Sequence, residues 1–217
     1  MTRSTDWKRY YKKRSIFSKL SGYLCQRSLQ GVFKSLNSSE AAFTTIVELG
    51  GGNSIIYPWL RQRFPRSRIL LIDKEEFAEP HFLRAAKNDQ ALTCLRHDLL
   101  ENCPEPTRLL GDLVLSFGLV EHFSPHGTRE MLERHFECCR PGGIVLVSFP
   151  CATPLYRGTR RLMELLGQWQ FHDERLLPPQ EVRNVMDQHG VELLSKLDIR
   201  LGLTQLILVY RKKGSEK

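Results

Sequence analysis

The sequence predicts an α/β fold with a seven-stranded, mostly parallel sheet, helices on both of its faces and an antiparallel hairpin at its C-terminal end. Short, almost continuously apolar segments alternate with helical patterns through the middle of the chain. Strands that are apolar throughout are typical of a parallel sheet covered by helices on both faces. Two further strand-like segments near the end stand too close together for a crossover helix, which indicates a hairpin.

Five segments have the composition of buried parallel strands: TTIVEL (44–49), RILLID (68–73), LTCLRHD (92–98), DLVLSF (112–117) and GIVLVSF (143–149). Between several of them stand helical patterns: SIIYPWLRQRF (54–64), EEFAEPHFLRAAKN (75–88) and GTREMLERHFECCR (127–140). We expect the third helix to stop at Pro141, which cannot continue it. A last helix is expected at 179–190, before the two strands of the hairpin at 191–201 and 203–212.

Size and composition restrict the prediction further. A chain of 217 residues that is 41% hydrophobic suits one medium-sized domain with at most a short appendage. Its longest apolar runs are far shorter than the roughly 20 residues that span a bilayer, and the polar start MTRSTDWKRY lacks a signal-peptide core. We therefore expect a cytoplasmic protein. The six cysteines show no metal-site spacing, so we expect reduced thiols, mostly in the core, and no metal.

Positive charge is concentrated at the N-terminus. Residues 1–36 contain nine Lys or Arg and one acid, and the rest of the chain carries 23 of each sign, so this segment accounts for the net charge of +8. We predict a basic helical arm over 1–40, in front of a nearly neutral domain over 41–217.

The loop VELGGGNS at 47–54 lies between the first strand and the first helix. Its glycines would let a ligand approach the backbone and the N–H groups of the helix start, although an ordinary tight turn would also use glycine. The dinucleotide fingerprint G-x-G-x-x-G does not fit, because position 55 is Ile, and this disfavours a nicotinamide oxidoreductase. Glu48 on the preceding strand favours a positively charged ligand instead.

Five motifs together resemble the class I methyltransferases that use S-adenosylmethionine: VELGGGNS, LLIDKE, RHDLL, DLVLSFGLVEHF and CRPGGIVLVSFP. The similarity covers about residues 44–150 and is greatest to small-molecule enzymes of the methyltransferase type 11/12 kind, which have an E-x-G-x-G-x-G loop and an EH pair after the fourth strand. It implies a Rossmann-like fold and S-adenosylmethionine as the cofactor. Ser54 stands where the family usually has its third glycine.

The resemblance also implies roles for single residues. Glu48 would orient the glycine loop and favour the positive charges of the cofactor, and Asp73 would bind both ribose hydroxyls. Asp98 would bind the adenine amino group, with Leu99 against the ring, although an ordinary loop aspartate explains Asp98 equally well. The implied cofactor-binding residues are Glu48, Gly50, Gly51, Gly52, Asp73, Lys74, Asp98, Leu99, Phe117 and Gly118.

His122 is the candidate catalytic residue, because it leaves the fourth strand at the sheet edge where ligands of such folds bind. A general base is needed only for a reluctant nucleophile such as a hydroxyl. A structural role, in which Glu121 and His122 start a helix beside the cofactor, is at least as well supported by the sequence.

The acceptor is expected under a cap formed by the insertion at 151–178. This insertion is too long for a simple turn between the fifth strand and the last helix. Together with the arm it supplies the candidate substrate-binding residues Tyr11, Tyr156, Arg157 and Trp169.

The sequence therefore favours a methyltransferase enzyme for a small-molecule or lipid- or sugar-linked acceptor, with an O-methyl product. An RNA methyltransferase and a non-catalytic binding protein of the same fold remain alternatives. Nucleic acid is not favoured, because LSFGL at 115–119 lacks the signature of enzymes that methylate base amino groups. The basic, aromatic arm could form a lid over the site or attach the protein peripherally to an anionic membrane surface.

Overall fold

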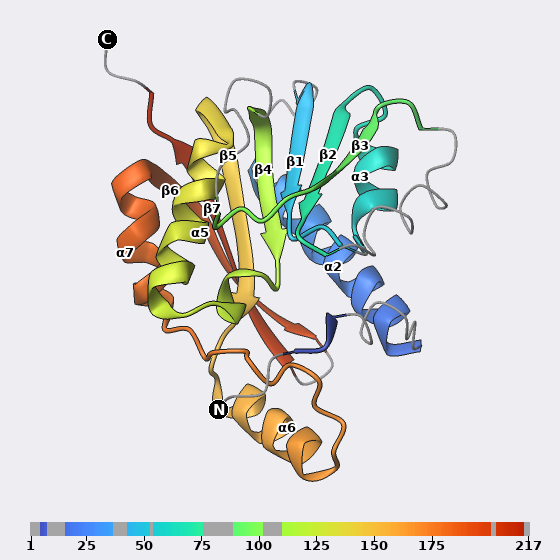
Figure 1. The fold of residues 1–217 in the computed structure, drawn as a ribbon, viewed down its shortest axis with the longest axis vertical. Helices are drawn as coiled ribbons and strands as arrows, with labels where there is room; N and C mark the ends of the chain where they lie inside the picture. The colour runs from blue at the N-terminus through green and yellow to red at the C-terminus, as the bar shows by residue number, and fades with distance from the viewer. Residues whose placement is uncertain are drawn as a thin grey trace.

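The computed structural model describes residues 5–7, 16–36, 43–52, 54–75, 89–101, 110–200 and 203–214. Within these residues the chain forms one seven-stranded sheet of order β3-β2-β1-β4-β5-β7-β6, in which β7 is antiparallel to both neighbours (Figure 1). The strands are β1 (Thr45–Leu49), β2 (Arg68–Asp73), β3 (Leu92–Arg96), β4 (Gly111–Phe117), β5 (Cys139–Pro150), β6 (Gly190–Arg200) and β7 (Leu203–Lys212). The helices are α2 (Ile16–Ser35), α3 (Tyr57–Arg63), η3 (Val120–His122), α5 (Pro125–Glu137), α6 (Pro154–Leu165) and α7 (Pro179–His189).

This architecture confirms the predicted fold class and the predicted strands. The central strands β1, β2 and β4 are buried along almost their whole length, as expected for strands covered on both faces. The predicted helix at 75–88 lies mostly outside the described residues.

The helix before Pro141 ends earlier than predicted. Helix α5 ends at Glu137, three residues earlier than the sequence indicated. Cys139 already pairs with Gly111 of β4, and the register then shifts before Leu113 pairs with Ile144. Pro141 and Gly142 therefore lie inside an irregular strand start, where Gly142 takes a positive φ of 74°, instead of ending the helix.

Apolar side chains form a core on each face of the sheet. Helices α5 and α7 cover one face through residues such as Leu132, Phe136 and Met186. Helices α2 and α3 cover the other face (Figure 1). Hydrophobic burial of this kind contributes roughly 25 cal/mol per Å² of apolar surface and is the main stabilising contribution to the fold.

The second half of α2 belongs to this core. Cys25, Leu29, Val32 and Phe33 are almost completely buried against the sheet. A deletion of residues 1–36 would remove these side chains and open the core. A test of the arm by truncation therefore has to stop before α2.

The carboxyl ends of the parallel strands lie at one end of the molecule. In Figure 1 this end is the lower one, where α6 and the described N-terminal residues also lie. Polar groups that follow β1, β2 and β4 are thus gathered next to two segments that are remote in the sequence. No helix among the described residues has both the length and the apolar character needed to cross a bilayer.

Candidate cofactor and acceptor site

The loop after β1 is held in a tight, polar arrangement. Gly50 has a φ of +68° and donates its N–H to the carbonyl oxygen of Ile72 at 2.8 Å. A left-handed backbone of this kind favours glycine. The Ser54 hydroxyl donates to Glu48 Oε2 at 2.7 Å and accepts the N–H of Tyr57 at 2.9 Å. Ser54 thus links β1 to the start of α3.

Glu48 is a buried acid without a cation beside it in the described structure. Burial raises the pKa of the Glu48 carboxyl to about 8; the hydrogen bond from Ser54 lowers it, and the nearby charge of Asp73 raises it. Such a group resists ionisation until a positively charged partner compensates for its lost hydration.

Asp73 lies at the end of the next strand and is oriented by two backbone donors. Its Oδ2 accepts the N–H of Gly52 at 2.7 Å, and its Oδ1 accepts the N–H of Glu75 at 2.9 Å. The N–H of His97 donates to the carbonyl oxygen of Asp73 at 2.8 Å. These bonds bring the ends of β1, β2 and β3 together around one carboxylate.

The other candidate cofactor residues lie around the same edge. Asp98 is half-buried and accepts the N–H of Leu100 at 3.0 Å, which is what a loop-capping aspartate does, while Leu99 is buried in the core. Gly118 has a φ of +64° after β4, next to half-buried Phe117. Lys74 is exposed.

Comparisons with known proteins agree with this geometry. No protein-family model matches the sequence, and no curated protein matches it significantly. Among solved structures, magnesium protoporphyrin IX methyltransferase (ChlM) from Synechocystis PCC 6803 with bound S-adenosylhomocysteine matches with a TM-score of 0.70, 15% identity and coverage of 95% of this chain and 93% of that chain. The N-methyltransferase NodS from Bradyrhizobium japonicum WM9, also with bound S-adenosylhomocysteine, matches with a TM-score of 0.61, 14% identity and 86% coverage of each chain.

An O-methyltransferase family protein from Burkholderia thailandensis matches with a TM-score of 0.65 and 16% identity over 87% of this chain. The chain spans only 57% of that protein's length. The fold is that of the class I methyltransferases. Identities this low establish the fold and leave the activity to be argued from the site.

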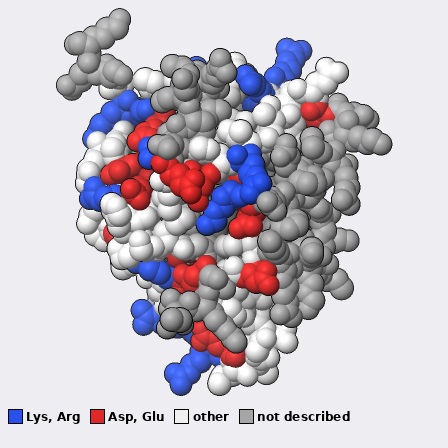
Figure 2. Space-filling model, viewed as in Figure 1, with Lys and Arg blue, Asp and Glu red and all other residues white. Residues whose placement is uncertain are grey.

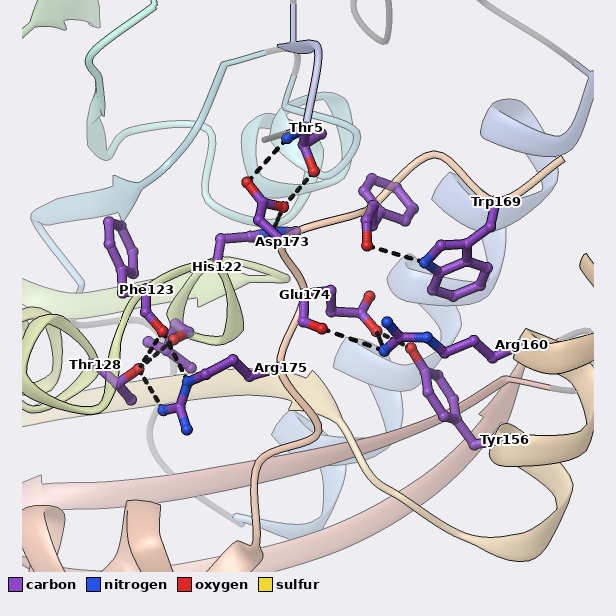
Figure 3. A network of polar contacts seen from close by, with 12 residues as sticks. Thr5, His122, Phe123, Thr128, Tyr156, Arg160, Trp169, Asp173, Glu174 and Arg175 are labelled. Atoms are coloured by element: carbon purple, nitrogen blue, oxygen red, sulfur yellow. Dashed lines mark hydrogen bonds and ion pairs between the residues drawn. The ribbon is translucent and has the colours of Figure 1, made fainter. Parts of the chain in front are cut away.

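After β4, His122 of η3 is held by a chain of polar contacts (Figure 3). Its Nδ1 lies 2.9 Å from Asp173 Oδ1. The N–H of Thr5 donates to Asp173 Oδ2 at 3.1 Å, and the Thr5 hydroxyl contacts Oδ1. The ring of Trp7 meets the imidazole edge to face, with centroids 4.8 Å apart. Residues from the N-terminus, η3 and the cap therefore meet at His122.

Two opposing effects act on these groups. Burial lowers the pKa of His122, against the raising effect of Asp173, so its imidazole is neutral near pH 7. Burial alone would raise the pKa of Asp173, but hydrogen bonds from Thr5 and His122 lower it. A carboxylate at Nδ1 leaves the second ring nitrogen, Nε2, as a proton acceptor.

A second cluster lies within the cap (Figure 3). The buried Tyr156 hydroxyl donates to Glu174 Oε1, and Arg160 Nη1 lies 3.2 Å from the same oxygen. The Arg160 guanidinium also stacks over Trp169 at 5.2 Å, while Trp169 Nε1 donates to the carbonyl oxygen of Phe171 at 2.9 Å. These contacts tie α6 to the segment that carries Asp173 and Glu174.

Glu121 stands between the two clusters. It is 1% exposed, and its Oε2 has no hydrogen-bond partner within the described part of the chain. Burial raises the pKa of Glu121 well above its ordinary value; its own backbone N–H lowers it, and the charges of Glu174 and Asp173 raise it. The backbone N–H of Arg175 donates to the Glu121 carbonyl oxygen at 2.9 Å, which fixes the cap segment to η3.

The predicted acceptor residues have different outcomes. Tyr156 and Trp169 lie in the cap cluster. Arg157 is exposed on α6, and the arginine that contacts Glu174 is Arg160. Tyr11 lies outside the described residues. The sequence reading missed Asp173, Glu174 and Thr5, although the acidic pair in QFHDER at 170–175 was a visible signal inside an otherwise basic insertion.

Residues 8–15, which contain five of the nine Lys and Arg of the arm, lie outside the described residues. On the face drawn in Figure 2, the Lys and Arg side chains that are described lie interspersed with Asp and Glu. The body of the molecule thus offers no uniformly basic surface in this view.

Proposed function

We propose that the protein is an S-adenosylmethionine-dependent methyltransferase for a small-molecule acceptor, and that the methyl group goes to a hydroxyl. The observation that carries this proposal is the joined arrangement of Gly50, Glu48 and Asp73 at the carboxyl ends of β1 and β2. Solved structures of the same fold with bound S-adenosylhomocysteine, including the Synechocystis and Bradyrhizobium enzymes, support the choice of cofactor.

The residues fit this cofactor. A Cβ atom at Gly50 would lie 2.7 Å from the side chain of Leu119, so a side chain there would enter the space between the loops after β1 and β4. The buried Glu48 carboxyl would gain a cationic partner. Asp73 accepts a backbone N–H at each oxygen, which orients its carboxylate at the end of β2, and a carboxylate oxygen can accept more than one hydrogen bond.

Bound S-adenosylmethionine supplies a methyl group that its sulfonium already activates. The chain then has to orient the acceptor and exclude water. His122 accepts the hydroxyl proton at Nε2, while Asp173 holds Nδ1–H and stabilises the imidazolium that forms.

The N-terminal residues act as a lid in this proposal. Thr5 and Trp7 contact Asp173 and His122 directly, so the start of the chain covers the acceptor side. The lysines and arginines that follow would face an anionic membrane if the acceptor is linked to a lipid.

Two glycines with similar backbones allow a matched test of the cofactor site. Gly50 and Gly142 have φ angles of +68° and +74°, so replacement by Ala strains both. We expect Gly50→Ala to weaken binding of S-adenosylhomocysteine, measured by titration calorimetry, by tenfold or more. Gly142→Ala should leave the affinity unchanged, because nothing lies within 4 Å of its added Cβ. Equal affinities in the two folded variants would reject the assigned site.

The acceptor can be found with a labelled cofactor. Purified protein and isotope-labelled S-adenosylmethionine are incubated with fractionated small molecules and lipids, and methylated products are identified by mass spectrometry. We expect a labelled O-methyl product that the Asp73→Ala variant does not form. Binding of the cofactor without a product in any fraction would favour a non-catalytic protein.

A further inference from the structure

One buried group near the proposed acceptor site has no role in this mechanism. Glu121 is 1% exposed, yet its Oε2 lacks a hydrogen-bond partner among the described residues. An unpaired buried carboxyl costs a protein several kcal/mol if it is ionised. Burial raises the pKa of this carboxyl, and a positively charged partner placed beside it would favour its ionised form.

The position of Glu121 indicates where this partner would lie. Glu121 is in η3, directly after the loop at Gly118 that leaves β4. A Cβ atom added at Gly118 would lie 3.4 Å from Glu121 Oε1. The Glu121 carboxyl therefore lies beside the loop after β4, which contains the candidate cofactor residue Gly118. The cap carboxyls of Glu174 and Asp173 are also near enough for their charges to raise the pKa of Glu121.

The neighbouring acids already have partners. Asp173 contacts His122 and Thr5, and Glu174 contacts Tyr156 and Arg160. Arg160 pairs with Glu174 and His122 contacts Asp173, whereas Oε2 of Glu121 has no partner among the described residues. An additional positive charge would relieve the mutual repulsion of these three carboxyls, whereas a neutral hydroxyl would not.

The surroundings also suit an organic cation. The rings of Trp7, His122 and Phe171 are in mutual contact beside Asp173, with centroid distances of 4.8 to 6.2 Å. Aromatic rings next to carboxylates are a common setting for ammonium groups. We propose that Glu121 binds a positively charged amine of the acceptor as an ion pair, beside the methyl-transfer centre.

This inference rests on the proposed function and names the substrate class as amine-bearing small molecules. The amine anchors the acceptor at Glu121, while the group to be methylated faces the cofactor. The acceptor enters when the N-terminal lid lifts from Asp173 and His122.

The test uses two probes that differ in one group. Tyramine carries an ammonium group where tyrosol carries a hydroxyl, and both are titrated into the full-length protein with S-adenosylhomocysteine present. We expect wild type to bind tyramine at least tenfold more tightly than tyrosol. Glu121→Gln should abolish the difference, and Glu130→Gln, which removes an acid from α5 in an ion pair with His126, should keep it.

The folded stability of Glu121→Gln provides an independent measurement. A side-chain amide can donate to the neighbouring carboxyls, so we expect its melting temperature to equal or exceed that of wild type. A melting temperature several degrees lower would mean that Glu121 is a structural group and would overturn the proposal.

Equal affinities for the two probes, no binding of tyramine, or a preference that persists in Glu121→Gln would overturn it as well. Binding of S-adenosylhomocysteine to each protein, measured in a separate titration before the probes are added, separates these outcomes from failure of the proposed function. If the wild-type protein does not bind S-adenosylhomocysteine, the methyltransferase assignment is rejected. If it binds S-adenosylhomocysteine but does not prefer the amine, only the role of Glu121 is rejected.

Discussion

At the scale of the residue, the contact between His122 and Asp173 decides how the imidazole titrates. Asp173 raises the pKa of His122, and burial, the larger effect, lowers it. We expect Asp173→Asn to lower the His122 pKa further, because burial remains and the negative charge is lost. Nitrogen-15 NMR titration of the histidines measures this shift.

The same spectra report the tautomer of the ring. With Asp173 present, the proton of neutral His122 should lie on Nδ1. Asp187→Asn, which changes a residue bonded to Tyr210, serves as the control and should leave His122 unaltered. An unchanged pKa and tautomer in Asp173→Asn would show that the carboxylate does not position the ring.

At the scale of the element, α6 holds the cap together. Thr153 is its N-cap and accepts the N–H of Tyr156 at 3.2 Å, and Thr153→Ala should cost about 0.5–2 kcal/mol in the stability of this helix. We expect faster hydrogen exchange in α6 and slower methyl transfer, since α6 carries Tyr156 and Arg160 to Glu174, with unchanged affinity for S-adenosylhomocysteine.

Ser124→Ala is the matched control for this helix. Ser124 caps α5 in the same way, accepting the N–H of Gly127 at 3.2 Å. Its loss should speed exchange in α5 and leave α6 as in wild type. If both variants affect methyl transfer equally, α6 has no special part in acceptor binding.

The N-terminal segment is the second element whose role can be tested. Deleting residues 1–7 removes Thr5 and Trp7 from the acceptor side but leaves α2 in place. Burial is the main cause that lowers the His122 pKa, so we expect this pKa to rise and methyl transfer to slow in a folded protein. An unchanged His122 titration and full activity would show that these residues are not a lid.

At the scale of the whole molecule, buried acids make stability depend on pH. The pKa of Glu48 is about 8 in the folded protein, against 4.5 as its ordinary value. Between these values the unfolded chain has lost a proton that the folded chain still holds, so stability falls as pH rises. We expect Glu48→Gln to raise the melting temperature more at pH 8 than at pH 5.

Calorimetric melting curves at the two pH values measure this difference. Glu130→Gln, which removes a half-buried acid from α5, is the control for the loss of one carboxyl. A gain for Glu48→Gln that is the same at both pH values would mean that the Glu48 carboxyl ionises normally in the folded protein.

The sequence by itself determined the fold class and where the candidate cofactor residues lie along the strands. Buried parallel strands are apolar along their whole length, so β1, β2, β4 and β5 could be recognised locally. Glu48, Gly50 and Asp73 are placed by the ends of neighbouring strands, and parallel strands bring such ends to one edge. The end of α5 could not be recognised in this way, because it depends on the pairing of Cys139 with β4.

Only the tertiary structure decided the acceptor side. Asp173 is 51 residues from His122 and 168 from Thr5 along the chain, yet it bonds both. Such contacts depend on how the cap and the N-terminal residues pack over the sheet. This packing cannot be inferred from the local pattern of apolar and polar residues. The burial of Glu121 has the same origin: its neighbours come from different elements, and their packing removes the water that would otherwise solvate the carboxyl.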